Sequence, residues 1–286
     1  MPIPLILKTN IYRYLYCQKN LHLRSTLMRI IASVVMINFV IGEHETLIFD
    51  ATVSNVVLGI AKWFSNYIDE LTYFIIFLSV LFGLGVYQKI TKPLFIMFSI
   101  IYLYIFDHEI SEIVPTIWSY TVPLPIILFT LLFLNTNALS VDSFLTKEKL
   151  KKTTHTQSFI FSFYQLYIPL IFFQSAISKL MVTGPTWFLE ADILLTHIKL
   201  LNAPAGFHLT QYPFILKSFA FMTGFFELLG FGILYLSRKV YLLFAIVFHL
   251  MTHLIMEISF IFIYPFYFPI FLELNWLTKK LKLDNE

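Results

Sequence analysis

Residues 214–256 read FILKSFAFMTGFFELLGFGILYLSRKVYLLFAIVFHLMTHLIM. The segment holds two apolar runs, 214–236 and 240–256, and a basic turn with Arg238 and Lys239 lies between them. A helix needs roughly 20 apolar residues to cross the hydrocarbon core of a bilayer. The segment therefore predicts two membrane-spanning helices joined by a short basic loop.

Similar apolar runs recur along the whole chain. They predict an all-α integral membrane protein, a bundle of about eight transmembrane helices that forms one polytopic domain, residues 1–286. The expected spans are 26–42, 71–87, 92–106, 113–134, 158–180, 214–236, 240–256 and 259–274. The last two spans are almost continuous, so a re-entrant pair is an alternative there. Residues 47–64 are only moderately apolar and are expected to lie at the membrane interface.

Composition supports the membrane class. Hydrophobic residues make up 58% of the chain and charged residues only 13%, whereas a soluble domain carries about 25% charged residues. The single Cys17 excludes an internal disulfide. No stretch interleaves basic and aromatic residues as a nucleic-acid groove does, so the expected partner is the lipid bilayer and not a nucleic acid.

The basic residues predict the orientation. Loops that stay cytoplasmic hold an excess of Lys and Arg, and most of the 20 basic residues fall on one side of the eight-span map. Both the N-terminus and the C-terminus are therefore expected to be cytoplasmic, together with the hydrophilic loop 135–157. The expected location is the cell (plasma) membrane.

Ionisable residues inside the spans are the candidate functional residues. Each costs about 2.5 to 3.5 kcal/mol at the centre of a span, so each needs a partner or a purpose. They are Asp107, His108, Lys179, Glu227, His249, His253 and Glu257. On the predicted map, one group of these residues lies at the same depth on the outer side of the bilayer: Asp107, His108, Lys179, His253 and Glu257. His249 and Glu227 lie nearer the midplane. Lys179, His108 and His249 are expected to line one pocket that opens toward the outer leaflet.

Each of these residues also has a simpler interpretation. Lys179 could be an interfacial lysine that extends its amine to the membrane surface, or a desolvated base. A carboxylate in direct contact favours the ammonium form, so a base at Lys179 should lie apart from Asp107. Glu227 could hydrogen-bond a neighbouring helix. His249 and His253 have the i, i+4 spacing of a metal pair, but no third ligand is evident and no metal is predicted.

Three stretches resemble the HTTM family, the membrane domain shared with vitamin K-dependent γ-carboxylase. The first, YQLYIPLIFFQSAISKLMVTGPTWFLEADIL (residues 164–194), carries the small-residue-then-Lys-Leu pattern at Lys179 and Leu180, followed by Trp187. The second, residues 225–262, carries Glu227 and the pair Phe248 and His249. The opening LHLRSTLMRIIASVVMINFVIG is similar to the family's first helix. Similarity to the sporulation-delaying protein B group is comparable.

The resemblance implies a membrane enzyme with a lysine base and a reduced quinone as cofactor. It assigns the base to Lys179 and makes His108 and His249 catalytic partners. Asp107 and His108 stand where the carboxylase has an Asn-His pair. The remaining residues with substrate or proton-relay roles are Asp107, Trp187, Glu227, His253 and Glu257. The carboxylase's large lumenal domain has no counterpart in this sequence, so glutamate carboxylation itself is not expected.

Three hypotheses on function follow. The first is a γ-carboxylase-like membrane enzyme that acts on a lipid-soluble, quinone-like or peptide substrate at the outer half of the bilayer. The second is an accessory protein for the maturation, export or immunity of a secreted peptide. The third is a small proton-coupled transporter that uses Glu227, His253 and Glu257 as a relay.

Overall fold

A computed structural model describes residues 18–50, 67–113, 123–146, 154–190, 192–200, 204–256, 263–272 and 274–281. Helices form all the regular structure in these ranges, which confirms the predicted helical class. The chain divides into two compact units. Unit 1 comprises residues 1–163 and 273–286, and unit 2 comprises residues 164–272.

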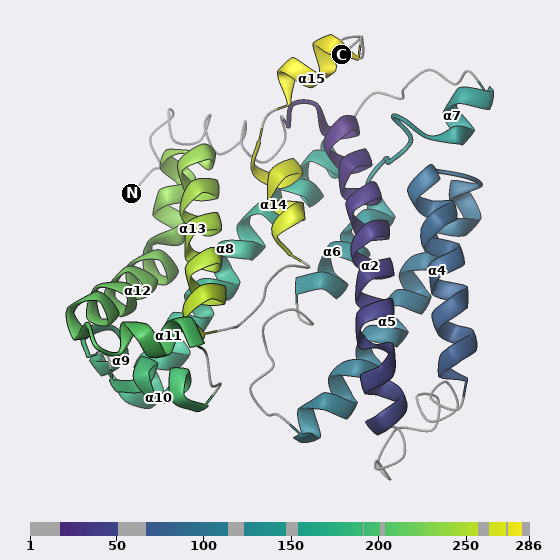
Figure 1. Cartoon of the computed structure of the whole chain (residues 1–286). Coiled ribbons are helices and arrows are strands. Elements are labelled where there is room, and N and C mark those ends of the chain that lie inside the picture. The colour runs from purple at the N-terminus through teal and green to yellow at the C-terminus, as the bar shows by residue number, and fades with distance from the viewer. Residues whose placement is uncertain are drawn as a thin grey trace. The chain divides into compact units, whose positions relative to one another are not determined.

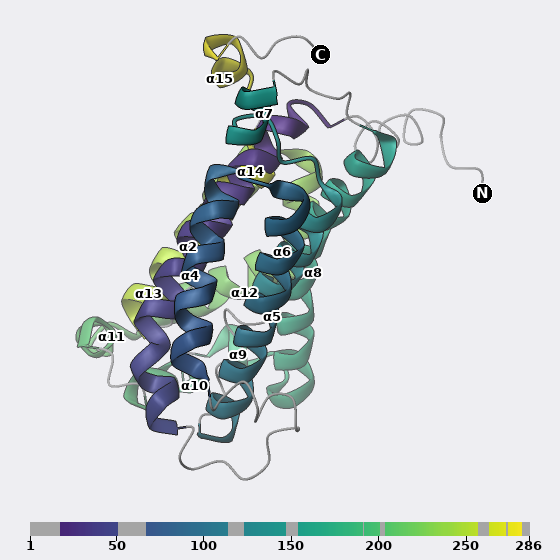
Figure 2. The ribbon, with the colours of Figure 1, turned by 90° about the vertical axis from the view of Figure 1, so that its right-hand side faces the viewer.

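Unit 1 contains the N-terminal helices. They are α2 (Leu21–Asp50), α4 (Ile68–Leu84), α5 (Gln88–Ile113), α6 (Pro123–Phe133), α7 (Val141–Thr146), the first part of α8 (His155–Thr183), and α15 (Asn275–Lys280). The long helices α2 and α4 lie side by side (Figure 2). Their close approach occurs where Gly83 faces Ser33, because a Cβ at Gly83 would come within 3.0 Å of the Ser33 Cβ.

Among its described residues, unit 2 contains the rest of α8 and six further helices. They are α9 (Thr186–Leu189), α10 (Asp192–Leu200), α11 (Pro204–Leu209), α12 (Pro213–Leu236), α13 (Arg238–Met256) and α14 (Tyr264–Phe271). The short helices α9, α10 and α11 gather beside α12 and the C-terminal end of α13 (Figure 1). These three short helices lie in the connection between the long helices α8 and α12.

Four helices in the described ranges are long and apolar enough to cross a bilayer. They are Leu21–Gly42, His155–Thr183, Pro213–Tyr235 and Arg238–Ile255. They correspond to the first, fifth, sixth and seventh predicted spans, and they support the assignment as a membrane protein. Helix α6 is apolar but shorter.

Several helix boundaries differ from the predicted spans, and α2 extends over 21–50 instead of 26–42. Helix α5 extends over 88–113 instead of 92–106, and within the predicted span 113–134 the described helix is α6, Pro123–Phe133. Within the predicted span 259–274, the described helix is the eight-residue α14, which contains Pro269. Eight residues rise about 12 Å, less than the hydrocarbon core. Most of the predicted interfacial segment 47–64 lies outside the described residues.

A buried polar cluster fixes the connection between α4 and α5 in unit 1. The Arg29 guanidinium is fully buried and donates to the carbonyl oxygens of Thr136 at 2.6 Å and Leu139 at 2.9 Å. Asp142 of α7 accepts hydrogen bonds from the backbone N–H groups of Tyr87, which precedes α5, and of Gln88, the first residue of α5. We call Arg29, Gln88, Thr136 and Asp142 the polar cluster. It holds segment 136–142 against α2 and α5.

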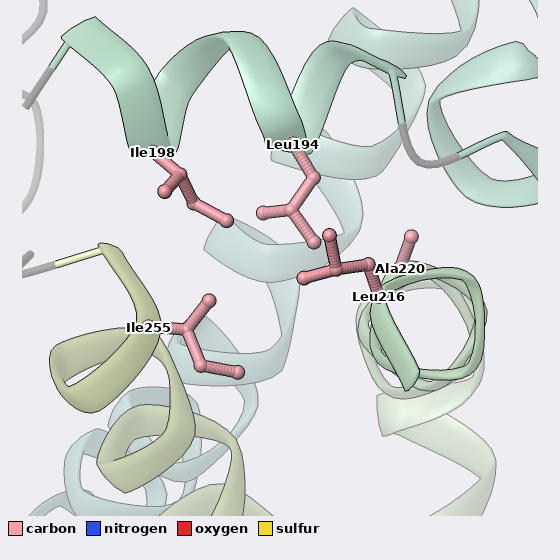
Figure 3. Packing of buried hydrophobic residues seen from close by; sticks show 5 residues of the cluster. All are labelled: Leu194, Ile198, Leu216, Ala220 and Ile255. Carbon is pink, nitrogen blue, oxygen red and sulfur yellow. The ribbon is translucent and has the colours of Figure 1, made fainter. Parts of the chain in front are cut away.

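An apolar cluster forms the core between the short and long helices of unit 2. Leu194 and Ile198 of α10 point toward Leu216 and Ala220 of α12 and toward Ile255 of α13 (Figure 3). These five side chains are at most 4% exposed. Their burial holds the α9–α11 segment next to α12, which contains one of the candidate site residues.

Candidate functional site

Lys179 and Glu227 form an ion pair in unit 2. The Lys179 Nζ lies 2.6 Å from the Glu227 Oε1 and donates a hydrogen bond to it. Lys179 lies one turn before the end of α8, and Glu227 lies in the second half of α12. The Lys179 side chain is 23% exposed and that of Glu227 only 3%. On the predicted map these groups lie at different depths, whereas the structure brings them into contact. We call them the Lys179–Glu227 pair.

The end of α8 brings Trp187 over the lysine. Gly184 adopts φ +65°, a left-handed conformation that ends the helix, and its N–H donates to the Leu180 carbonyl. The Thr186 hydroxyl then bonds to the Thr183 carbonyl at the start of α9. This tight reversal places the Trp187 ring 5.0 Å from the Lys179 Nζ, within the range of a cation–π interaction.

Packing of α9 on α12 fixes this arrangement. The Phe188 ring lies against Gly224, and a Cβ at Gly224 would come within 2.2 Å of the Phe188 Cδ1 atom. Gly224 lies three residues before Glu227, on the same face of α12. The contact between Phe188 and Gly224 therefore sets the position of Trp187 relative to the Lys179–Glu227 pair.

A methyl group at Gly224 is expected to displace α9. Gly224→Ala should lower the free energy of unfolding by about 1–3 kcal/mol, the usual cost of overpacking, and should weaken the contact between Trp187 and Lys179. Gly232→Ala is the matched control on the same helix, because a Cβ there meets nothing within 4 Å. Denaturation of both variants in mixed micelles measures the difference. Equal stability of the two variants would show that Phe188 does not fix α9.

The Lys179–Glu227 pair retains hydrogen-bonding capacity. The Glu227 Oε2 is buried without a hydrogen-bond partner among the described residues, and the Ser175 hydroxyl lies beside the same carboxylate. An ammonium group has three donors, and Glu227 takes one of them. The part-exposed Lys179 ammonium therefore keeps donors that Glu227 does not occupy.

His249 belongs to a separate pair in the same unit. Its Nε2 lies 2.8 Å from the hydroxyl oxygen of Tyr267 on α14, and both side chains are at most 1% exposed. The Phe172 ring of α8 contacts the rings of both His249 and Phe226, with centroid distances of 5.3 Å each. Phe226 directly precedes Glu227, so Phe172 links the aromatic surroundings of His249 to the helix that carries the carboxylate.

His253, which has the i, i+4 spacing from His249, lies in a different environment. His253 is exposed, one turn beyond the buried His249, and Glu257 lies outside the described residues. In the described part of the chain, no three His, Cys, Asp or Glu side chains come together in a group that could hold a metal ion.

Asp107 and His108 lie in α5 of unit 1, but their side chains lie outside the described residues. Their expected convergence with Lys179 and His249 therefore stays a prediction. The carboxylate in contact with Lys179 is Glu227, whereas the sequence had suggested only Asp107 for that position. Tyr267 was not predicted, because it is one of 16 tyrosines and carries no signal of its own.

Comparison of the chain with protein-family models, with curated proteins and with solved structures gives no match.

Proposed function

We propose that this chain is a multi-pass enzyme of the cell membrane in which the Lys179–Glu227 pair transfers a proton to and from a lipid-soluble or peptide substrate. The observation that carries the proposal is the 2.6 Å contact between a part-exposed lysine and a buried carboxylate. The reaction class is the γ-carboxylase-like one that the HTTM resemblance implies, with Lys179 as the base.

The short hydrogen bond gives Lys179 a way to act as a base beside a carboxylate. The proton of the ammonium can move from Nζ to Oε1 along the existing bond, which leaves a neutral amine and a carboxylic acid. Such a neutral pair avoids the cost of two charges in a medium of low dielectric constant. Lys179 then accepts a proton from the substrate, and Glu227 stores the proton that Lys179 released.

The side chains of Lys179 and Glu227 differ in exposure, and we assign their roles accordingly. Lys179 is 23% exposed and can be reached by a substrate, whereas Glu227 is 3% exposed and cannot be reached without movement of α8 or α12. Trp187 covers the Lys179 Nζ on one side and limits the access of water. The residue that contacts the substrate in this proposal is Lys179, and Glu227 acts through it.

The residues present are compatible with a reduced quinone. Lys179 could bond to a ring hydroxyl, and Trp187 could stack on a flat ring. These two residues would hold the cofactor, which would supply an oxidisable hydroxyl group. His249 and Tyr267 form the second polar pair of unit 2, and we assign His249 a supporting role in proton transfer.

The eight-span map with cytoplasmic termini is part of the proposal. Four of its spans are long apolar helices, and α4 contributes 17 further residues. In this map the end of α8 and the segment α9–α11 face the outside, so the Lys179–Glu227 pair lies in the outer half of the bilayer.

Glu227→Gln tests the proton-storing role. Glutamine still accepts the Lys179 hydrogen bond but cannot take up its proton, so we expect function to fall by at least about 10-fold. Function is measured as the ability of the variant to restore the phenotype lost when the parental gene is deleted. Glu190→Gln, at the exposed end of α9, is the matched control. Parental function of the Glu227→Gln variant would show that the pair only holds α8 and α12 together. Such a structural pair is what the accessory-protein hypothesis expects.

A further inference from the structure

Thr223 of α12 has a buried hydroxyl oxygen without a hydrogen-bond partner among the described residues. A threonine inside a helix can satisfy its hydroxyl by donating to the carbonyl oxygen four residues earlier. Thr183 of α8 and Thr252 of α13 do so, at 2.9 Å and 2.7 Å. The Thr223 hydroxyl does not make this bond, so its hydrogen-bonding capacity remains available.

The Glu227 carboxylate lies on the same face of α12 as Thr223. Residues four apart share one face of a helix, and helical side chains point back toward the N-terminus. The Glu227 side chain therefore extends from its own turn toward the turn of Thr223. Its Oε1 is bonded to Lys179, whereas its Oε2 is buried without a hydrogen-bond partner among the described residues. Two buried polar atoms thus share one face of α12 within one turn.

Burial restricts what can bind between these two atoms. Thr223 and Glu227 do not bond to each other, so a bond between them needs an intermediary. The buried Phe188 ring packs on Gly224, next to Thr223, which keeps large ligands away. Buried waters make about 2–4 hydrogen bonds to polar groups that otherwise lack partners. The Lys179 ammonium, bonded to the other oxygen of the same carboxylate, offers a third partner. A water molecule therefore fits the size and the chemistry of this position.

We propose that one internal water molecule binds between Thr223 and Glu227. It donates one hydrogen bond to the Glu227 Oε2, and a second bond joins it to the Thr223 hydroxyl, so that both buried polar atoms are satisfied. The water site itself stands on the geometry of α12. Its role, which rests on the proposed function, is to stabilise the Glu227 carboxylate while the proton is on Lys179, because hydrogen bonds to a carboxylate favour its charged form.

The stability of Thr223→Val distinguishes a bound water from an unsatisfied hydroxyl. Valine has nearly the shape of threonine but removes one partner of the water. We expect the equilibrium constant for unfolding in mixed micelles to rise at least about 5-fold, the effect of leaving one buried polar group without a partner. Without a bound water, the exchange of an unsatisfied hydroxyl for a methyl group should stabilise the protein instead. Thr252→Val is the matched control, because that hydroxyl bonds to a carbonyl of its own helix, and it should stay close to the parent.

Solid-state NMR of the full-length protein in lipid vesicles observes the water directly. The side-chain carboxyl carbons of glutamate are labelled with carbon-13, and magnetisation is transferred to them from water protons. Glu227→Gln identifies the Glu227 signal by its loss. The parent and Thr223→Ser, which keeps the hydroxyl, should show transfer to this carbon, and Thr223→Val should lose most of it. This readout does not depend on catalysis, so it tests the water site even if Lys179 proves not to be a base. Absence of the transfer in the parent, or a Thr223→Val variant at least as stable as the parent, would overturn the water site.

Discussion

Lys179→Met is expected to lower the free energy of unfolding by about 3–5 kcal/mol, the usual cost of removing one partner of a buried ion pair. Methionine keeps much of the length of the side chain but removes the cation. Glu227, 3% exposed, then loses the cation with which it pairs. Unfolding in mixed micelles, followed by circular dichroism, measures the change.

The two partners should respond differently. Glu227→Leu should cost less than Lys179→Met, because the part-exposed Lys179 can turn its amine toward the membrane surface. The double variant Lys179→Met/Glu227→Leu should regain most of the lost stability, since no buried charge remains. Lys217→Met, at an exposed position of α12, should change stability by no more than about 0.5 kcal/mol. Additive losses in the double variant would mean that the two side chains do not interact.

Lys179→Arg is expected to lower function by at least about 100-fold while the protein remains folded. Arginine keeps the positive charge and can bond to the Glu227 carboxylate, so the ion pair survives. Its guanidinium stays protonated at any accessible pH and cannot accept a proton from a substrate. General base catalysis typically contributes 10²–10⁴-fold, and this contribution should be lost.

The arginine variant also distinguishes a base from an anchor. A lysine that only extends to the membrane surface, or only clamps α8 to α12, is replaced well by arginine. Function is measured by complementation, and unfolding in mixed micelles verifies the fold. Lys217→Arg is the matched control on α12. Near-parental function of Lys179→Arg would exclude a base at this position and favour the accessory role.

The long helices were predictable because charged residues mark their boundaries in the sequence. The basic pair Arg238 and Lys239 separates two apolar runs, and the structure ends α12 at Leu236 and starts α13 at Arg238. The predicted span 259–274 was less accurate. It was assigned from apolar composition alone, whereas Pro265 and Pro269 lie in this stretch, and the helix that contains them is only eight residues long. Proline limits continuous helix hydrogen bonding without lowering the apolar character of a segment.

The members of the candidate site were predictable, but their pairing was not. Lys179 and Glu227 each stand out because a charge inside an apolar helix is costly. Their contact depends on how α8 is positioned along α12. In the same region, Phe188, which follows α8 in the chain, packs on Gly224 of α12. That packing joins residues far apart in the chain, and neither a phenylalanine nor a glycine signals it. His249 stood out in the same way, while its partner Tyr267 did not.

The most direct test of the account measures the protonation of Lys179 itself. An amine reacts with an acylating reagent only when it is neutral, and a carboxylate in contact favours the ammonium form. Removal of the Glu227 charge should therefore speed acylation of Lys179. The protein in lipid vesicles is treated with a membrane-permeant succinimidyl ester, and mass spectrometry compares the labelling rate of Lys179 with that of the exposed Lys239. We predict that Glu227→Gln raises the relative rate at least about 10-fold, corresponding to about 1.4 kcal/mol of coupling. An unchanged relative rate would contradict the coupling of the two groups and with it the proposed acid–base pair.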